Sequence, residues 1–323
     1  MKLLKKNNLR IKLLSSYVIL VLLPFLISTF VLSSTSSSNI RTNTLSYINL
    51  FVEQISSNID SYIGELDRMT RIITLDSSMC NILTEPSGND AVSNYLNSQH
   101  LENEILKMTT QQPSIRNVTF IGVNGMIYSG TSNSITDTDL FFDITHADDI
   151  DEQDSNIYLS SAHIPSYLLV DYHQNTEPVF TLTRPLYTYN KQKIGSVVLI
   201  ITCEDLLNAI NINPSLLENG ARIVVTNKDN KIVADTSENF VPENLSDKTY
   251  MVLDNSDQND TKNLFFSDDS GSLTSTVIIS KNQLFKSTLD FNRASIFLVL
   301  ILIGLIILLS FYFSYRLVRP LKL

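Results

Sequence analysis

Two apolar segments bracket this chain and limit the architectures open to it. One runs from about Leu13 to Leu32 and the other from about Ile296 to Phe313. A helix needs about 20 residues to cross a hydrocarbon core roughly 30 Å thick. We therefore predict transmembrane helices at 13–33 and 296–315, with everything between them on one side of a membrane.

The charges beside these segments set the orientation. Basic residues occupy both tails, and neither tail holds an Asp or Glu: Lys2, Lys5, Lys6, Arg10 and Lys12 before the first span, and Arg316, Arg319 and Lys322 after the second. Basic flanks stay in the cytoplasm. We expect a two-span protein of the cell membrane with both termini cytoplasmic, including the tail 1–12. The chain has a formal charge of −9, and its acidic residues lie outside, so nucleic acid is not an expected partner.

A cleaved secretory signal is the alternative for the first span, because it also combines a basic start with an apolar run. Signals have an apolar run of about 7 to 15 residues. The run here is longer, and Ser33 to Ser38 offers only a loose cleavage site. An anchor is therefore favoured over a signal.

The segment 34–78 is predicted to form one long helix that rises from the membrane. Its apolar residues recur at steps of three and four, as in an amphipathic helix: Ile48, Phe51, Ile55, Ile59, Tyr62, Leu66, Met69 and Ile73. About 40 helical residues span about 60 Å, which exceeds one small domain. This apolar face could pack on the core of its own chain or against the same helix of a second copy, and we weigh the two equally. A homodimer is therefore an expected partner.

The rest of the outer part changes from helical to strand periodicity. A second helix is predicted at 90–110, a hairpin at 118–129 with its turn at Asn124-Gly125, and strands near 156–161, 167–172, 178–189 and 193–202. A helix is predicted at 204–210. After Asn213-Pro214 a smaller set of strands follows at 221–226, 231–234, 262–267 and 272–280. This predicts an α+β fold with two antiparallel-sheet units, a membrane-distal unit at 79–212 and a membrane-proximal unit at 213–280, and then a connecting helix at 281–295.

Directly after the second span the chain reads Tyr315-Arg316-Leu317-Val318-Arg319-Pro320-Leu321. With the order of elements above, this resembles a bacterial double-Cache receptor running into a HAMP linker at 316–323. It is most similar to sensor histidine kinases of the YesM type, since Thr183–Tyr187 and Ile194–Leu199 resemble the closing strands of their membrane-distal unit. The resemblance implies two PAS-like Cache units.

The resemblance also implies a function: the extracytoplasmic sensing and transmembrane signalling part of a two-component sensor histidine kinase. No catalytic residue stands in this chain, so kinase activity is expected only if the chain continues beyond residue 323. The alternatives are the sensor region of a chemoreceptor or diguanylate cyclase, and a static envelope protein with two anchors. A continuous helix through 281–294 would favour a receptor, because it could transmit a shift.

In double-Cache receptors the ligand usually binds in the membrane-distal unit. The candidate ligand-binding residues there are Tyr128, Phe142, Tyr158, Tyr167, Tyr172, Arg184 and Tyr187, with Phe141 and His163 beside them. Aromatic rings give flat apolar walls, and the fork of Arg184 suits a carboxylate or phosphate. The alternative is that the aromatic residues are core and that Arg184 forms a structural ion pair.

The resemblance does not extend to the residues that bind free amino acids in such domains. There is no tryptophan, no arginine between Tyr128 and Arg184, and Ile200 stands where those domains have an Asp. The expected partner is therefore a small extracellular ligand, namely a sugar, a peptide or an organic acid, or a ligand-binding protein, together with membrane lipid.

No cofactor or metal is expected. His100, His146, His163 and His173 lack the spacing of a zinc site, and the acidic stretch 143–151 lacks that of a calcium loop. Cys80 and Cys203 are expected to be two buried small residues and not a disulfide. Signal transmission is predicted to depend on Gly304, Arg316, Arg319 and Pro320, which define how the second span leaves the bilayer.

Overall fold

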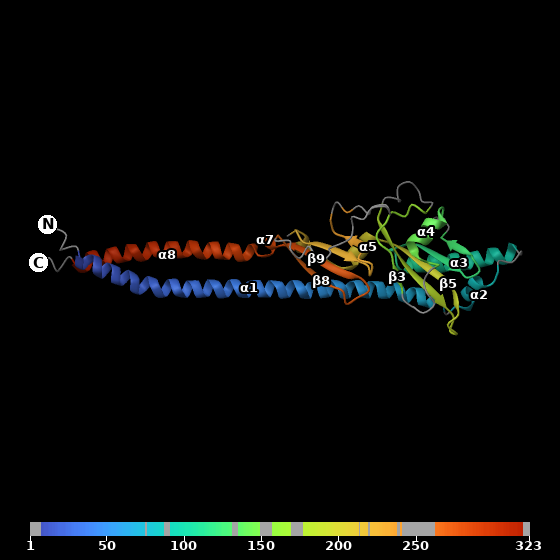
Figure 1. Cartoon of the computed structure of the whole chain (residues 1–323), viewed down its shortest axis with the longest axis horizontal. Helices are drawn as coiled ribbons and strands as arrows, with labels where there is room; N and C mark the ends of the chain where they lie inside the picture. The colour runs from blue at the N-terminus through green and yellow to red at the C-terminus, as the bar shows by residue number, and fades with distance from the viewer. Residues whose placement is uncertain are drawn as a thin grey trace. The chain divides into compact units, whose positions relative to one another are not determined.

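The computed structural model describes residues 8–74, 76–86, 91–130, 135–148, 157–168, 177–212, 214–218, 220–237, 240 and 262–318 (Figure 1). The chain divides into two compact units. Met1–Asn49 with Lys281–Leu323 form what we call the helical unit, and Leu50–Ser280 form the sheet unit.

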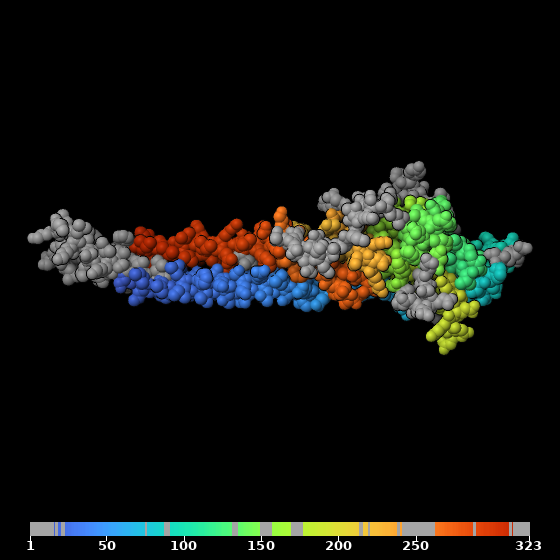
Figure 2. Space-filling view, in the orientation of Figure 1, coloured from blue at the N-terminus to red at the C-terminus, as the bar shows by residue number. Residues whose placement is uncertain are grey.

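The helical unit pairs the first part of α1 (Asn8–Ile73) with α7 (Lys281–Leu284) and α8 (Lys286–Val318). The Ser33 hydroxyl donates to the side-chain carbonyl of Asn292 at 3.2 Å. The Arg41 guanidinium lies over the Phe285 ring, 5.2 Å from its centre. Figure 2 shows the side chains of α8 packed against those of α1 in this unit.

In the described part of the chain, one stretch is long and apolar enough to cross a membrane, Leu289–Leu309 in α8. It overlaps the predicted span 296–315. The predicted span 13–33 is helical as part of α1, but some of its side chains fall outside the described ones, and its crossing of a membrane remains a prediction. The predicted connecting helix corresponds to α7 and the start of α8. The helix is interrupted at Phe285, a turn residue between α7 and α8, whose N–H donates to the Lys281 carbonyl and whose carbonyl accepts the Leu289 N–H.

The sheet unit contains two antiparallel sheets. The first has the order β2-β1-β5-β4-β3 and the second β7-β6-β9-β8. The strands of the first sheet are β1 (Ile115–Gly122), β2 (Ile127–Ser129), β3 (Tyr158–Leu159), β4 (Val179–Tyr187) and β5 (Lys193–Thr202). Those of the second are β6 (Arg222–Thr226), β7 (Ile232–Asp235), β8 (Asn263–Asp268) and β9 (Thr274–Ser280). The predicted α+β class with a long N-terminal helix and two antiparallel sheets is confirmed.

The helices of the sheet unit cover the sheets with apolar side chains. They are the second part of α1, α2 (Ser77–Thr84), α3 (Ala91–Gln111), α4 (Thr138–Thr145), α5 (Cys203–Ala209) and α6 (Pro214–Glu218). The predicted stripe of α1 is buried at Ile55, Ile59, Tyr62, Leu66, Met69 and Ile73. On the first sheet, α4 joins a core cluster of Phe141, Ile144, Ala147, Tyr167, Leu168, Val179, Val198 and Ile200.

Three local features differ from the sequence-based expectations or refine them. The long helix ends at Ile73 and not near residue 78, because the Asp76 carboxylate accepts the Ser78 N–H and begins α2 as its N-cap. Helix α4 was not predicted. Both cysteines are free, Cys80 half-buried and Cys203 buried, and burial raises the pKa of the Cys203 thiol.

Candidate functional site

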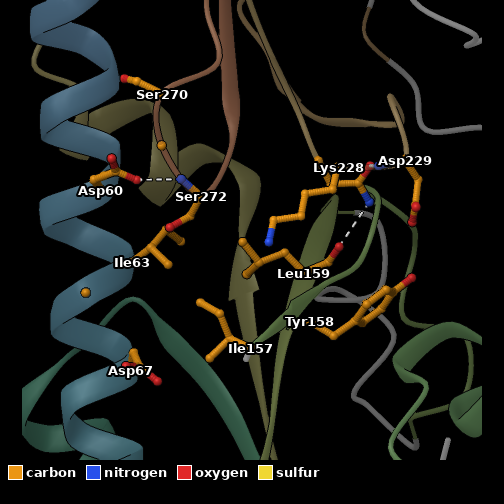
Figure 3. A pocket seen from close by; sticks show the side chains of 13 residues that line it. Asp60, Ile63, Asp67, Ile157, Tyr158, Leu159, Lys228, Asp229, Ser270 and Ser272 are labelled. Atoms are coloured by element: carbon orange, nitrogen blue, oxygen red, sulfur yellow. Dashed lines mark hydrogen bonds between the residues drawn. The ribbon is translucent and has the colours of Figure 1, made fainter. Parts of the chain in front are cut away.

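A cavity of about 530 Å³ opens in the sheet unit. That volume lies within the range of about 300 to 1,000 Å³ that is typical of small-molecule sites. Its lining comes from four places: Asp60, Ile63, Gly64 and Asp67 of α1; Ile157, Tyr158 and Leu159 at β3; Asn227, Lys228 and Asp229 of the β6–β7 turn; and Ser270, Gly271 and Ser272 of the β8–β9 turn (Figure 3). Both sheets and α1 therefore meet around one space.

Helix α1 is joined to the second sheet through one carboxylate. The backbone N–H of Ser272 donates to Oδ1 of Asp60 at 2.7 Å (Figure 3). A Cβ atom at Gly271 would lie 2.4 Å from Oδ2 of the same aspartate. The β8–β9 turn needs glycine here because the carboxylate approaches its backbone so closely.

The two sheets are joined through the side chain of Asn227, which is 3% exposed. Its Nδ2 donates to the carbonyl of Leu159 at 3.0 Å, while its Oδ1 accepts the N–H groups of Asp229 and Lys231. The local bonds form an Asx turn that shapes the β6–β7 turn. A second link runs from the Ala162 N–H to the Ile232 carbonyl at 2.8 Å.

Asp67, at the other end of the cavity, is already paired. Its Oδ1 accepts from Nη1 of Arg184, and its Oδ2 lies 2.8 Å from Nη2 of Arg71. The side chains of Arg184 and Asp67 are 12% and 14% exposed. Burial lowers the pKa of Arg184, which still stays charged at neutral pH. The fork that was expected to clamp a ligand is therefore occupied by a carboxylate from α1.

The remaining charges of the cavity are less well matched. Lys228 extends from its turn toward α1 (Figure 3). Within the described residues, neither Lys228 nor Asp60 belongs to an ion pair. Burial, followed by the charges of Asp229 and Asp143, raises the pKa of Tyr158. No group of three potential metal ligands occurs among the residues that the structure describes.

The sheet register separates the residues predicted to form one ligand site. Residues directly opposite on neighbouring strands share a face of the sheet. One row, Tyr128, Phe120, Val197 and Arg184, lies on one face, and the next row, Ser129, Thr119, Val198, Thr183 and Tyr158, lies on the other. Tyr128 and Arg184 therefore share a face, and Tyr158 lies opposite, on the side of the α4 cluster.

The other predicted residues take different positions. Phe142 is half-buried and packs against the α4 cluster. Tyr167 is fully buried, with Phe141 edge-on at 5.4 Å, and Tyr158 packs edge-on against His146 at 4.7 Å. Tyr187 is half-buried at the end of β4. Tyr172 lies outside the described residues.

A buried polar pair, His163 and Tyr167, lies at the side of the apolar cluster. His163 Nδ1 is 2.9 Å from the Ser161 carbonyl, and its Nε2 is 2.9 Å from the Tyr167 hydroxyl. Burial lowers the pKa of His163 to about 4 and raises that of Tyr167. A carbonyl only accepts, so the neutral ring carries its proton on Nδ1, and Nε2 accepts from the Tyr167 hydroxyl.

Sequence reasoning did not single out Asp60, Asn227, Lys228 or Gly271 as site residues. Asp60 lies on the polar side of an amphipathic helix, where it cannot be distinguished from a solvated carboxylate. The β6–β7 turn lies between the predicted strands 221–226 and 231–234, and Asn227, a residue type common in turns, was the signal available there.

No family model matches this chain, and no curated protein matches it. Among solved structures, it is similar to the sensory domain of the Campylobacter jejuni chemoreceptor Tlp3 with isoleucine bound, at 14% identity and a TM-score of 0.49, over 77% of this chain and 97% of that one. It is also similar to the extracellular domain of vpHK1S-Z8, which is assigned as a histidine kinase, at 15% identity and a TM-score of 0.49, over 77% and 96% of the chains.

A third similar structure is the ligand-binding domain of the Pseudomonas aeruginosa amino acid chemoreceptor PctB in complex with L-Arg. It shows 11% identity and a TM-score of 0.47, over 74% of this chain and 96% of that one. Likenesses at this level do not identify a family or a ligand for this chain.

Proposed function

We propose that this chain is the ligand-sensing and transmembrane signalling part of a bacterial receptor, and that the receptor is a sensor histidine kinase. The observation that carries this proposal is the continuity of α1 over 66 residues. The same helix supplies Asp60 and Asp67 to the cavity, Ser33 to the contact with Asn292 of α8, and Arg41 to the contact with Phe285 just before α8. A ligand that moves α1 by about 1 to 2 Å would act on a helix that also reaches α8.

The C-terminal side of the sheet unit supplies a second route. Strand β9 ends at Ser280, α7 begins at Lys281, and the turn at Phe285 is hydrogen-bonded to Lys281 on one side and to Leu289 of α8 on the other. A flexible tether would absorb a displacement, whereas a hydrogen-bonded connection passes it on. This geometry supports a receptor over a static protein with two anchors.

The predicted ligand site in the membrane-distal unit 79–212 remains a proposal. Phe142 and Tyr158 lie on or near the α4 face of the first sheet and are half-buried, which supports the proposal that they form part of its wall, with Tyr172 as the third member proposed from the sequence. Arg184 lies on the opposite face of that sheet and already pairs with Asp67, so a ligand that reached it there would have to compete with this carboxylate. A carboxylate ligand that competes with Asp67 for Arg184 would thereby release α1.

A cysteine pair at positions 33 and 292 tests the signalling proposal. Ser33→Cys with Asn292→Cys, in a background where Cys80 and Cys203 are replaced, should lock α1 to α8 when oxidised. We expect the disulfide to hold phosphorylation of the response regulator at one level, and its reduction to restore regulation by ligand. The assay uses the full-length protein or a reporter kinase core joined in register after Leu323. Each single cysteine variant is the matched control.

Regulation that is the same in the oxidised, reduced and single-cysteine proteins would mean that the two helices are passive anchors. In that case the static envelope protein becomes the better description. The output measured for the protein would separate a kinase from a chemoreceptor or a diguanylate cyclase.

A further inference from the structure

We propose that the cavity between α1 and the two turns binds a small zwitterion, whose ammonium group pairs with Asp60 and whose carboxylate pairs with Lys228. This cavity shares Tyr158 with the site proposed in the membrane-distal unit, but its lining does not include Phe142 or Arg184. Only the signalling consequence of this inference rests on the proposed sensing function. Binding of the zwitterion can be measured without any signalling output.

The first argument is the pattern of satisfied and unsatisfied charge. Two other carboxylates of the sheet unit have a built-in guanidinium partner: Asp67 has Arg184 and Arg71, and Asp235 has Arg222. In the described part of the chain, Asp60 and Lys228 line the same cavity without an ion pair to each other or to another side chain. A molecule with both charges could pair with both groups and break no existing ion pair.

The second argument is that each charge is held on a fixed piece of backbone. The Asp60 carboxylate is held by the Ser272 N–H, and the turn that carries Lys228 is shaped by the Asn227 side chain. The two groups therefore start from opposite sides of the cavity, on α1 and on the second sheet (Figure 3). Preorganised partners lower the ordering cost of binding.

The third argument is the shape and lining of the space. A cavity of about 530 Å³ holds a molecule well above the size of one water. Between the two charges, Ile63, Ile157 and Leu159 supply apolar surface. This combination suits a short aliphatic chain with an ammonium group at one end and a carboxylate at the other. Asp229 adds a second negative charge beside Tyr158, so it offers a weaker alternative for the ammonium group.

Bound in this way, the zwitterion would tie α1 to the β6–β7 turn. The empty and filled cavities then differ in whether α1 is linked to the second sheet only through Ser272 or also through Lys228. This gives the receptor a contact that exists only with ligand bound, which is what a ligand-driven shift requires.

The test uses the full chain in detergent or lipid nanodiscs, with glycine, β-alanine, 5-aminopentanoate and glycylglycine as probes. We expect at least one of them to raise the melting temperature and to bind in calorimetry. The matched probes for 5-aminopentanoate are pentylamine and pentanoate, each of which loses one ion pair and should bind about tenfold more weakly or worse.

The variants Asp60→Asn and Lys228→Gln should each reduce the affinity at least tenfold. Asparagine keeps an oxygen for the Ser272 N–H, and Lys228 is exposed, so both variants should fold. The controls are Asp269→Asn and Lys231→Gln, which change exposed residues of the same two turns that do not line the cavity. Asp229→Asn should weaken binding by less than Asp60→Asn.

Two results would overturn the proposal. One is that no zwitterion in the set changes the melting temperature of the unaltered chain. The other is that a zwitterion binds Asp60→Asn and Lys228→Gln as well as it binds the unaltered chain. If such binding is lost instead on Phe142→Ala, the ligand occupies the membrane-distal site, and the sensing function stands without this inference.

Discussion

At the scale of single residues, the His163–Tyr167 pair is the most sensitive arrangement in the first sheet's core. Its two rings lie at the side of an apolar cluster, and each polar atom has one partner. Protonation of Nε2 would remove the acceptor of the Tyr167 hydroxyl and place a charge where water cannot reach it. The structure therefore depends on a neutral imidazole.

This arrangement predicts a loss of stability in mild acid. The pKa of His163 is about 4 in the folded state and about 6.5 in an unfolded chain. Between these two pH values the unfolded chain binds the proton and the folded chain does not. The contribution of neutral His163 to the free energy of unfolding is therefore complete above about pH 6.5 and decreases as the pH falls toward 4. The total loss is up to about 3 kcal/mol.

Denaturant unfolding at several pH values measures this slope. His163→Gln should reduce the slope of the free energy of unfolding against pH between pH 6.5 and 5, a range in which carboxylates contribute little. Equal slopes in the unaltered protein and in His163→Gln would show that His163 is not the titrating group.

At the scale of elements, the contact between α1 and the β8–β9 turn is the tightest joint of the cavity. Gly271→Ala should destabilise the protein by roughly 1 to 3 kcal/mol, because its Cβ would displace the Asp60 carboxylate from the Ser272 N–H. Chemical denaturation measures the loss. The added cost of the alanine should shrink in an Asp60→Ala background, where no carboxylate is left to displace.

Gly64→Ala is the matched control for the same joint. A Cβ at Gly64, in the interior of α1, meets nothing within 4 Å. Alanine should therefore stabilise the helix by roughly 0.5 to 1 kcal/mol. If Gly271→Ala proved as harmless as this change, α1 would not be held by the turn.

Most of these elements could be predicted from periodicity. Helix α3, the β1–β2 hairpin and the four strands of the second sheet lie within two or three residues of their predicted bounds, because each has a clear repeat between turn residues. Helix α4 was missed because it is one short amphipathic stretch. The sequence feature that indicates α4 is its N-cap residue, Asp137, whose side chain accepts the Leu140 N–H.

The cavity could not be predicted, because its lining comes from four segments far apart in sequence. Nothing in the order of residues states that Asp60 meets Ser272 or that Asn227 meets Leu159. The predicted aromatic set failed to form one wall for a related reason. Strand alternation places Tyr158 and Arg184 on opposite faces, and that depends on a register which only the pairing of β3 with β4 reveals.

At the scale of the whole molecule, we propose that α8 crosses the membrane and that, in a histidine kinase, the position at which it leaves the bilayer sets the signalling bias. Arg316 lies within α8, and a Cβ at Gly304 would meet nothing within 4 Å, while Arg319 and Pro320 fall outside the described residues. Basic residues seek the interface. Moving the arginine by one position displaces its anchor by about 1.5 Å along the helix.

Exchanging Tyr315 and Arg316 should therefore change basal output without changing ligand affinity. The measurement is phosphorylation of the response regulator by the full receptor without ligand. Exchanging Ser314 and Tyr315, which leaves Arg316 in place, is the matched control. An output that is the same in all three proteins would mean that this helix only anchors the chain.

The links between the two sheets have a consequence for how such a protein can diverge. Asn227 and Ala162 both donate to backbone carbonyls, those of Leu159 and Ile232. A carbonyl acceptor is present whatever side chain its residue carries. On the acceptor side, then, the joint places no demand on residue identity. Substitutions could accumulate there and reshape the space beside it while the sheets stay connected, so new ligand preferences could arise without a new scaffold.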